Sequence, residues 1–327
     1  MGLTRHLART LAAFLGLVFL AGCATAPPWP EPELEKPSLP DQVLLDQVPF
    51  FPQTRYQCGP AALATVLNAQ GLNTHPDVLK DLVYLPEREG SLQVEMVAAA
   101  RSHNMVVYPL EPELDAILEE IAAGNPVLVM QNLRLSWWPQ WHFAVVVGYN
   151  ANNETLILNT DTRRHYAQPY EAFHATWTRA GSWARVVLPP DRTPATAEPV
   201  AYLKAAFDLE TTGHTGAAGL AYQTAADHWP DHPSPLLAAG NLAYQRGEKA
   251  QAARDFITAI QRKPETAEAW NNLGFTLDEL SCPAQGTVAK QCAHQLNPER
   301  FALPAQSDNA GASGPTDHCP FLPACPN

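Results

Sequence analysis

The feature that most constrains the fold is a proline that returns at a fixed interval in the C-terminal part of the chain. Pro230, Pro264 and Pro298 follow one another at intervals of 34 residues. A period of about 20–50 residues is typical of stacked repeats, in which each unit buries its apolar face only against its neighbours. The interval therefore predicts an all-α repeat domain over residues 191–300, not a single closed core.

Aligned on these prolines, residues 199–298 divide into three units that resemble tetratricopeptide repeats. Gly240 and Phe256 supply the small and the large residue that the second unit needs, whereas Gly286 and Lys290 of the third unit stand where small and aromatic residues are usual. The resemblance implies a concave surface that holds a peptide or a partner protein. Because the segment holds no nucleophile or ligand cluster, we expect binding there and no chemistry.

The N-terminus carries a targeting signal. Arg5 and Arg9 precede an apolar run that ends at Gly22. The run is shorter than the roughly 20 residues needed to cross a bilayer, so residues 1–22 are predicted to be a signal peptide. It ends in Leu-Ala-Gly-Cys, which resembles the lipobox of bacterial lipoproteins. The resemblance implies that Cys23 is acylated and that, with Ala24 following it, the lipid holds the protein at the outer membrane. An ordinary secretory signal is the alternative.

The charge of the chain and the positions of its prolines indicate which partners to expect and where the linkers lie. The chain has 33 Asp and Glu residues against 21 Lys and Arg residues, a net charge of −12. Nucleic-acid binding needs clustered cations, so a nucleic acid is not an expected partner. Prolines concentrate in residues 23–46 and 301–327, which predicts a stiff tether after the signal peptide and a tail after the repeats.

The sharpest chemical signal lies at Cys58, which is followed by Gly59, Pro60 and an apolar periodicity. Proline is favoured just inside a helix start, so we expect Cys58 at the N-terminus of a helix that closes between Asn68 and Gly71. The N–H groups and dipole of a helix start favour a thiolate, which predicts a lowered pKa for the Cys58 thiol. An unpaired cysteine is also unusual in an oxidising compartment unless it has a chemical role.

A candidate base lies downstream, where His142 opens an apolar run that reads as a buried strand. The next strand ends in Asn159-Thr160-Asp161, and a carboxylate or amide there can lie beside the imidazole and orient it. The surrounding pattern alternates helix and strand, which favours an α+β domain. Strands are expected at residues 105–108, 126–130, 142–149 and 156–158, and helices at 92–102 and 114–123.

As a pair, the stretches that begin at Gln53 and at His142 resemble the papain-like cysteine peptidases, and within them the double-glycine leader peptidases of bacteriocin exporters. The resemblance covers residues 47–190 and implies an α+β papain-like cysteine peptidase domain. It implies that Cys58 is the nucleophile and His142 the general base and acid. It also implies that Gln53 contributes its amide to the oxyanion hole and that Asp161 orients His142.

Alternatives stay open at three of these positions. Gln53 lies five residues before Cys58, where the family more often shows six, so Gln57 is a second candidate for the oxyanion hole. The family usually shows Asp-Pro at the end of this strand, whereas this chain has Asn159-Thr160-Asp161-Thr162. Asn159 is therefore a second candidate for orienting His142, because an Asn has this role in papain-like enzymes generally. His165 is the other plausible base.

Two further features concern the surroundings of this site. Trp137, Trp138 and Trp141 directly precede His142, and we expect them either to line a peptide-binding cleft or to cover the strand ends. The sequence has no His-Glu-x-x-His or Cys-x-x-Cys motif, so we expect neither a metal ion nor another cofactor.

Four cysteines remain, Cys282, Cys292, Cys319 and Cys325. In an exported protein they predict two disulfides, for which three connectivities are possible. A regular helix would place Cys282 and Cys292 too far apart for a bond, although Pro283 could break that helix. We expect the tail to be attached to the third repeat.

The sequence thus predicts a lipid-anchored cysteine peptidase of the bacterial cell envelope that faces the periplasm. It would cleave a peptide or protein substrate and recruit that substrate, or a partner protein, through its repeats. Two other interpretations stay open: a cell-wall peptide amidase or endopeptidase on the same scaffold, and a non-catalytic adaptor that binds peptides or proteins.

Overall fold

The computed structural model describes residues 39–53, 57–302 and 319–326. The predicted signal peptide, the lipidation site Cys23 and most of the tether lie outside these residues. The part of the chain from Leu39 onward forms one compact unit. None of the helices in the described residues has the length and apolarity that a membrane span requires.

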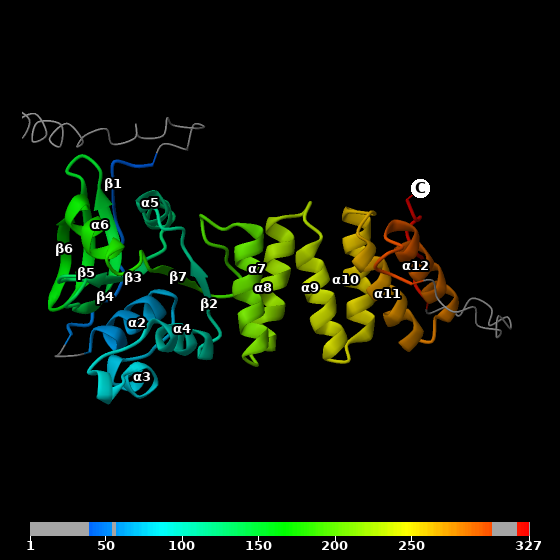
Figure 1. Ribbon diagram of the computed structural model, residues 1–327, viewed down its shortest axis with the longest axis horizontal. Coiled ribbons are helices and arrows are strands. Elements are labelled where there is room, and N and C mark those ends of the chain that lie inside the picture. Colours follow the sequence, from blue (N-terminus) through cyan, green and yellow to red (C-terminus); the bar gives the residue numbers. More distant parts are fainter. Residues whose placement is uncertain (1–38, 54–56, 303–318, 327) are drawn as a thin grey trace, which may run out of the picture. The chain divides into compact units, whose positions relative to one another are not determined.

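A seven-stranded antiparallel sheet forms the centre of the first domain (Figure 1). The strand order is β2-β7-β3-β4-β5-β6, and the short β1 pairs with the far end of β4. The four strands predicted from the sequence are confirmed as β2, β3, β4 and β5. The strands are β1 (Gln42–Leu44), β2 (Val106–Pro109), β3 (Val127–Asn132), β4 (Trp141–Asn150), β5 (Thr155–Thr160), β6 (Arg163–Pro169) and β7 (Ala184–Leu188).

Helices cover both faces of this sheet, because the central strands are apolar on both sides. In β4, Val145 packs into the core under α2, whereas Ala144 and Val146 face the opposite core. The predicted helices at Cys58, at 92–102 and at 114–123 are confirmed as α2, α4 and α5. On one face lie α2 (Cys58–Ala69), α3 (Pro76–Val83) and α4 (Gln93–Ser102), with the 3-10 turn η1 (Pro86–Arg88); α5 (Leu114–Ala122) and α6 (Tyr170–Thr178) lie on the other.

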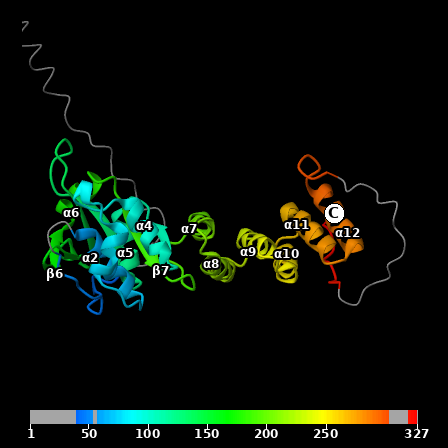
Figure 2. The same ribbon diagram turned by 90° about the horizontal axis from the view of Figure 1, so that it is seen from below.

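Six helices follow as three consecutive pairs, and Figure 2 shows them in the same chain order from a second side. Each of the predicted closing prolines comes just after the second helix of a pair, so the three-unit register is confirmed. The helices are α7 (Pro199–Thr211), α8 (Thr215–His228), α9 (Ser234–Gln245), α10 (Lys249–Arg262), α11 (Ala267–Glu279) and α12 (Pro283–Leu296).

Glycines set the close packing within the second and third pairs. A Cβ on Gly240 would lie 2.5 Å from the ring of Phe256, so the ring fills the space that a side chain would need. In the third pair a Cβ on Gly274 would lie 2.5 Å from Cγ of Lys290, one repeat further along. Lys290 therefore takes the place of the aromatic residue: its aliphatic stem packs on Gly274 and its ammonium group pairs with Asp278.

Two disulfides attach the C-terminal tail to the third repeat, as predicted. Cys282 bonds to Cys319, and Cys292 bonds to Cys325, with Cα separations of 5.8 and 5.7 Å. Both repeat cysteines are buried in the core of α9–α12. The local pairing of Cys282 with Cys292 does not occur, because each is already bonded to the tail.

The segment between β7 and α7 is fixed to the first domain by a buried carboxylate. Oε1 of Glu120 accepts hydrogen bonds from the backbone N–H of Thr196 at 2.8 Å and from its hydroxyl at 2.7 Å. Oε2 accepts a third bond from Asn125 at 2.7 Å. Glu120 is fully buried, so these bonds replace the water that the carboxylate loses.

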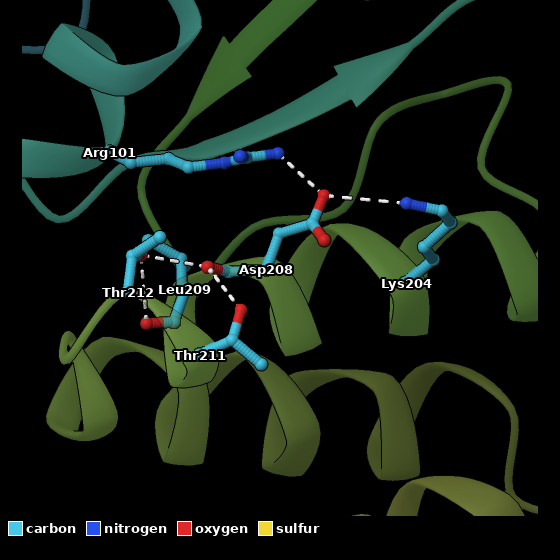
Figure 3. Close-up of polar contacts among 6 residues, drawn as sticks. All are labelled: Arg101, Lys204, Asp208, Leu209, Thr211 and Thr212. Carbon is cyan, nitrogen blue, oxygen red and sulfur yellow. Dashed lines mark hydrogen bonds and ion pairs between the residues drawn. The ribbon is translucent and has the colours of Figure 1, made fainter.

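Charged residues add a second connection between the two domains. Arg101 at the end of α4 lies 2.6 Å from Oδ2 of Asp208 on α7, and Lys204 lies 3.6 Å from the same oxygen (Figure 3). One apolar core also continues from the sheet into α7, α8 and α9. The first repeat helix therefore packs as part of the sheet domain.

Candidate active site

Cys58 is the first residue of α2, as the sequence predicts. The glycine that follows is required by close packing, because a Cβ on Gly59 would lie 2.2 Å from Oγ of Ser91 in the loop before α4. Pro60 occupies the first turn, where a missing N–H costs nothing. Gly59 and Pro60 thus let α2 begin at the cysteine while it packs closely on α4.

The thiol of Cys58 lies against the beginning of β4. The backbone N–H groups of Phe143, Gly59 and Cys58 itself donate toward the sulfur. Burial nevertheless raises the pKa of the Cys58 thiol above its ordinary value of 9.0, and these donors offset burial only in part. The expectation of a lowered pKa was therefore wrong for the free protein, because desolvation outweighs the helix start.

His142 is the second residue of β4, one position before the Phe143 amide that contacts the thiol. Its Nε2 lies 2.7 Å from Oγ1 of Thr160, so Nδ1 is the nitrogen left to face other groups. Burial lowers the pKa of His142 below 6.5, the nearby carboxylate of Asp161 opposes this, and Arg163 adds to it. The imidazole is therefore neutral near pH 7, which is the form that a general base needs.

The two predicted orienting candidates lie in different places. Asp161 is exposed at the turn after β5, with a positive φ of 53°, and acts on His142 through its charge. Asn159 is buried, and its amide bonds to the backbone O of Pro49 at 3.5 Å and to the N–H of His165 at 3.2 Å. Asn159 thus fixes the segment before Cys58, and the imidazole is hydrogen-bonded to the residue between the two candidates.

Thr160 was missed at the sequence level because only carboxylates and amides were considered as orienting groups. The signal that was available is its position, as the last residue of the strand next to the one that His142 opens.

The structure also places the remaining candidates. The backbone N–H of Gln53 donates to the carbonyl O of Asp161 at 2.9 Å, which brings the half-buried Gln53 beside the turn after β5. Gln57 is the N-cap residue of α2. His165 lies on β6, where its Nε2 is 3.9 Å from the carboxylate of Asp46. Gln53 and Asp161 are thus brought together, and His165 belongs to a different contact.

The tryptophans before His142 form an exposed hairpin. Trp137, Trp138 and Trp141 keep 79%, 61% and 51% of their surface exposed, and Trp137 stacks on Trp138 with ring centroids 6.3 Å apart. Arg134 lies over the Trp138 ring at 5.0 Å. Most of the surface of these rings therefore faces solvent.

Comparison with known proteins supports the first-domain assignment. Residues 45–184 match the model of the Peptidase_C39 like family. No curated protein matches the chain. Among solved structures, a putative C39-like peptidase from Bacillus anthracis is 16% identical and covers 47% of this chain and 100% of its own, with a TM-score of 0.39.

Two further solved structures resemble one or other part of the chain. The peptidase domain of Streptococcus ComA, a bifunctional ABC transporter of a quorum-sensing pathway, is 23% identical over 43% of this chain and 98% of its own, with a TM-score of 0.36. YrrB, a TPR protein with an unusual peptide-binding site, is 22% identical over 31% of this chain and 52% of its own, with a TM-score of 0.29. The resemblance drawn from the sequence is confirmed: residues 45–184 match the Peptidase_C39 like family model, and an all-α repeat domain follows them.

Proposed function

We propose that the protein is a cysteine peptidase in which Cys58 attacks a peptide carbonyl and His142 moves the proton. The observation that carries the proposal is the position of the thiol, at the start of α2 and against the backbone N–H next to His142. The family match over residues 45–184 supports the same chemistry.

The pKa directions favour a neutral resting pair of thiol and imidazole. In the proposed reaction Nδ1 of His142 accepts the thiol proton as sulfur bonds to the carbonyl carbon. The N–H of Cys58 and the amide of Gln53 hold the resulting oxyanion, and Asp161 favours the imidazolium through its charge. His142 then protonates the leaving amine as the C–N bond breaks, and water hydrolyses the thioester.

The exposed hairpin of Trp137, Trp138 and Trp141 supplies a surface for the substrate. The rings lie immediately before His142 in the chain, and large aromatic faces bind extended peptides by contact with their side chains. We therefore propose a peptide segment with apolar or aromatic side chains as the substrate. The repeats would recruit the protein that carries this segment.

The proposed setting is the bacterial cell envelope, with a lipid on Cys23 holding the protein at the outer membrane. Support comes from the Leu-Ala-Gly-Cys sequence and from the two tail disulfides, which suit an oxidising compartment. Metabolic labelling with a radioactive fatty acid tests the anchor: label should appear in the wild-type chain and be lost in Cys23→Ser.

The activity is tested with the full chain and its Cys58→Ala variant on a mixture of fluorescence-quenched peptides. We expect hydrolysis by the wild type and none by Cys58→Ala, with the melting curve unchanged. Trp137→Ala should raise KM because it removes exposed substrate-contact area without touching the core. Retained turnover in Cys58→Ala would contradict the proposal.

The same proteins distinguish the other interpretations. Release of muropeptides from purified sacculi, with the peptide mixture left intact, would favour the cell-wall enzyme. Binding of a partner by the repeats, with no turnover of either substrate, would favour the adaptor.

A further inference from the structure

We propose that Thr160 is the residue that positions His142, in the place where a carboxylate or amide was expected. The inference deepens the proposed function, since it assigns the third member of the same site. It rests on the hydrogen bond of 2.7 Å between Nε2 of His142 and Oγ1 of Thr160.

A bulge in the sheet explains why this residue faces the imidazole. Near the turn that joins β4 to β5, Asn150 pairs with Thr155 and Gly148 with Ile157. If this register continued along the whole of β4 and β5, His142 would lie on the same face of the sheet as Asn159 and Asp161, because side chains alternate between the two faces along each strand.

The register instead shifts by one residue between Val146 and Gly148. Val145 consequently pairs with Asn159, which turns Asn159 to the face of Val145 and Thr160 to the face of His142. The cores agree with this shift, since Val145 belongs to the core under α2, and Val146 with its partner Leu158 belongs to the core on the opposite face.

The surroundings of Thr160 make its hydroxyl a fixed group. Thr160 is 5% exposed and ends β5, and the chain then turns at Asp161, whose carbonyl is held by the N–H of Gln53 at 2.9 Å. A β-branched side chain has few χ1 rotamers, so the hydroxyl of a buried threonine keeps one direction.

The hydroxyl of Thr160 can accept a hydrogen bond from the tautomer of the imidazole that a general base needs. When Nε2 carries the proton and donates to Oγ1 of Thr160, Nδ1 keeps its lone pair and can accept the proton of Cys58. A hydroxyl is uncharged, so it orients the ring without the charge stabilisation that a carboxylate in contact would add. The charge of Asp161 then stabilises the imidazolium, and the hydroxyl of Thr160 orients the ring.

The test compares three substitutions in the full chain: Thr160→Val, which keeps the shape and removes the hydroxyl; Thr160→Ser, which restores it; and Thr160→Asp, which adds charge. Thr155→Val, at the other end of β5, is the matched control. The first readout is the ¹⁵N spectrum of the His142 ring, obtained by subtracting the spectrum of His142→Ala. We expect the Nε2–H tautomer in the wild type, a mixture of tautomers in Thr160→Val, and recovery in Thr160→Ser.

The second readout is peptide hydrolysis against pH. Thr160→Val should lower kcat about tenfold, the equivalent of one ordinary hydrogen bond, with KM unchanged. Thr160→Asp should move the acid limb of the profile to higher pH, because a carboxylate in contact raises the pKa of the imidazole.

An unchanged tautomer and kcat in Thr160→Val, equal to those of Thr155→Val, would overturn the assignment. The ring spectrum does not depend on turnover, so it decides the role of Thr160 even if Cys58→Ala shows that the peptidase proposal is wrong. If Thr160→Val does not fold, the spectrum of Thr160→Asp decides: ring shifts equal to those of the wild type would equally overturn the assignment.

Discussion

The ionisation state of Cys58 gives the sharpest test of the site. Burial raises the pKa of the thiol above 9.0 and lowers that of His142 below 6.5, so the two groups are both neutral between these values. A thiol with a pKa of 9.0 is about 1% ionised at pH 7, and a raised pKa makes the fraction smaller. Since the thiolate is the species that reacts, alkylation at pH 7 should run at less than about one-hundredth of its high-pH plateau.

The assay measures the rate at which iodoacetamide modifies Cys58 from pH 5 to pH 10, followed by mass spectrometry of the peptide that contains it. Cys58→Ala identifies the signal, and the four cysteines in disulfides serve as internal controls that should not react. His142→Ala should change the rate at pH 7 by less than about threefold, because a neutral imidazole adds no charge to stabilise the thiolate.

A different profile would refute this reasoning. A reactive plateau that extends below pH 7 in the wild type and disappears in His142→Ala would show a thiolate–imidazolium pair. In that case the donors at the start of α2 and at Phe143 outweigh burial, and the general-base step proposed above is replaced by direct attack of a preformed thiolate.

Four further predictions concern stability. Because folding lowers the pKa of His142, the stability that the neutral imidazole allows is complete above about pH 6.5 and is lost as the pH falls. The urea midpoint should therefore fall less steeply below that pH for His142→Ala than for the wild type. Gly240→Ala should destabilise the chain by about 1–3 kcal/mol, because its Cβ would lie 2.5 Å from Phe256. Gly219→Ala, whose Cβ would have its nearest neighbour at 3.6 Å, should stabilise by up to about 1 kcal/mol; urea unfolding of the two variants measures both. Replacing Cys282 and Cys319 by serine opens a cross-link between residues 37 apart and should cost roughly 4 kcal/mol of unfolding free energy, and thermal melting of the double variant against the wild type checks it.

Much of the fold was predictable because its signals are local. Cys58, Gly59 and Pro60 mark a helix start within three residues, and the 34-residue proline interval sets the register of all six repeat helices. The attachment of the tail to the third repeat was expected as well. The pairing of Cys282 with Cys319 had to come from the structure, since it depends on where the tail lies in space.

The site itself was predictable only in part, and the reasons are physical. Burial reverses the expected effect of the helix start on Cys58, and the amount of buried surface around one thiol cannot be read from periodicity. The bulge before Gly148 likewise could not be read from the sequence, and it decides which residue at the end of β5 faces His142. Without it, Asn159 and Asp161 would share a face with His142 and the sequence-based candidates would be in position. One extra residue in β4 turns Asn159 and Asp161 away from the face of His142 and brings the hydroxyl of Thr160 to that face.

That exchange also bears on how much catalytic power the site can have. A carboxylate in contact with an imidazole both orients the ring and stabilises its positive charge, whereas Thr160 can do only the first. Asp161 is exposed at the turn after β5, so its charge interaction with His142 should weaken as salt is added. If the two functions are divided in this way, raising ionic strength should lower kcat in the wild type and leave it nearly constant in Asp161→Asn. Thr160→Asp, which reunites both functions in one buried residue, should then retain its activity at high salt. Equal salt dependence in all three proteins would mean that charge near His142 does not contribute to the rate.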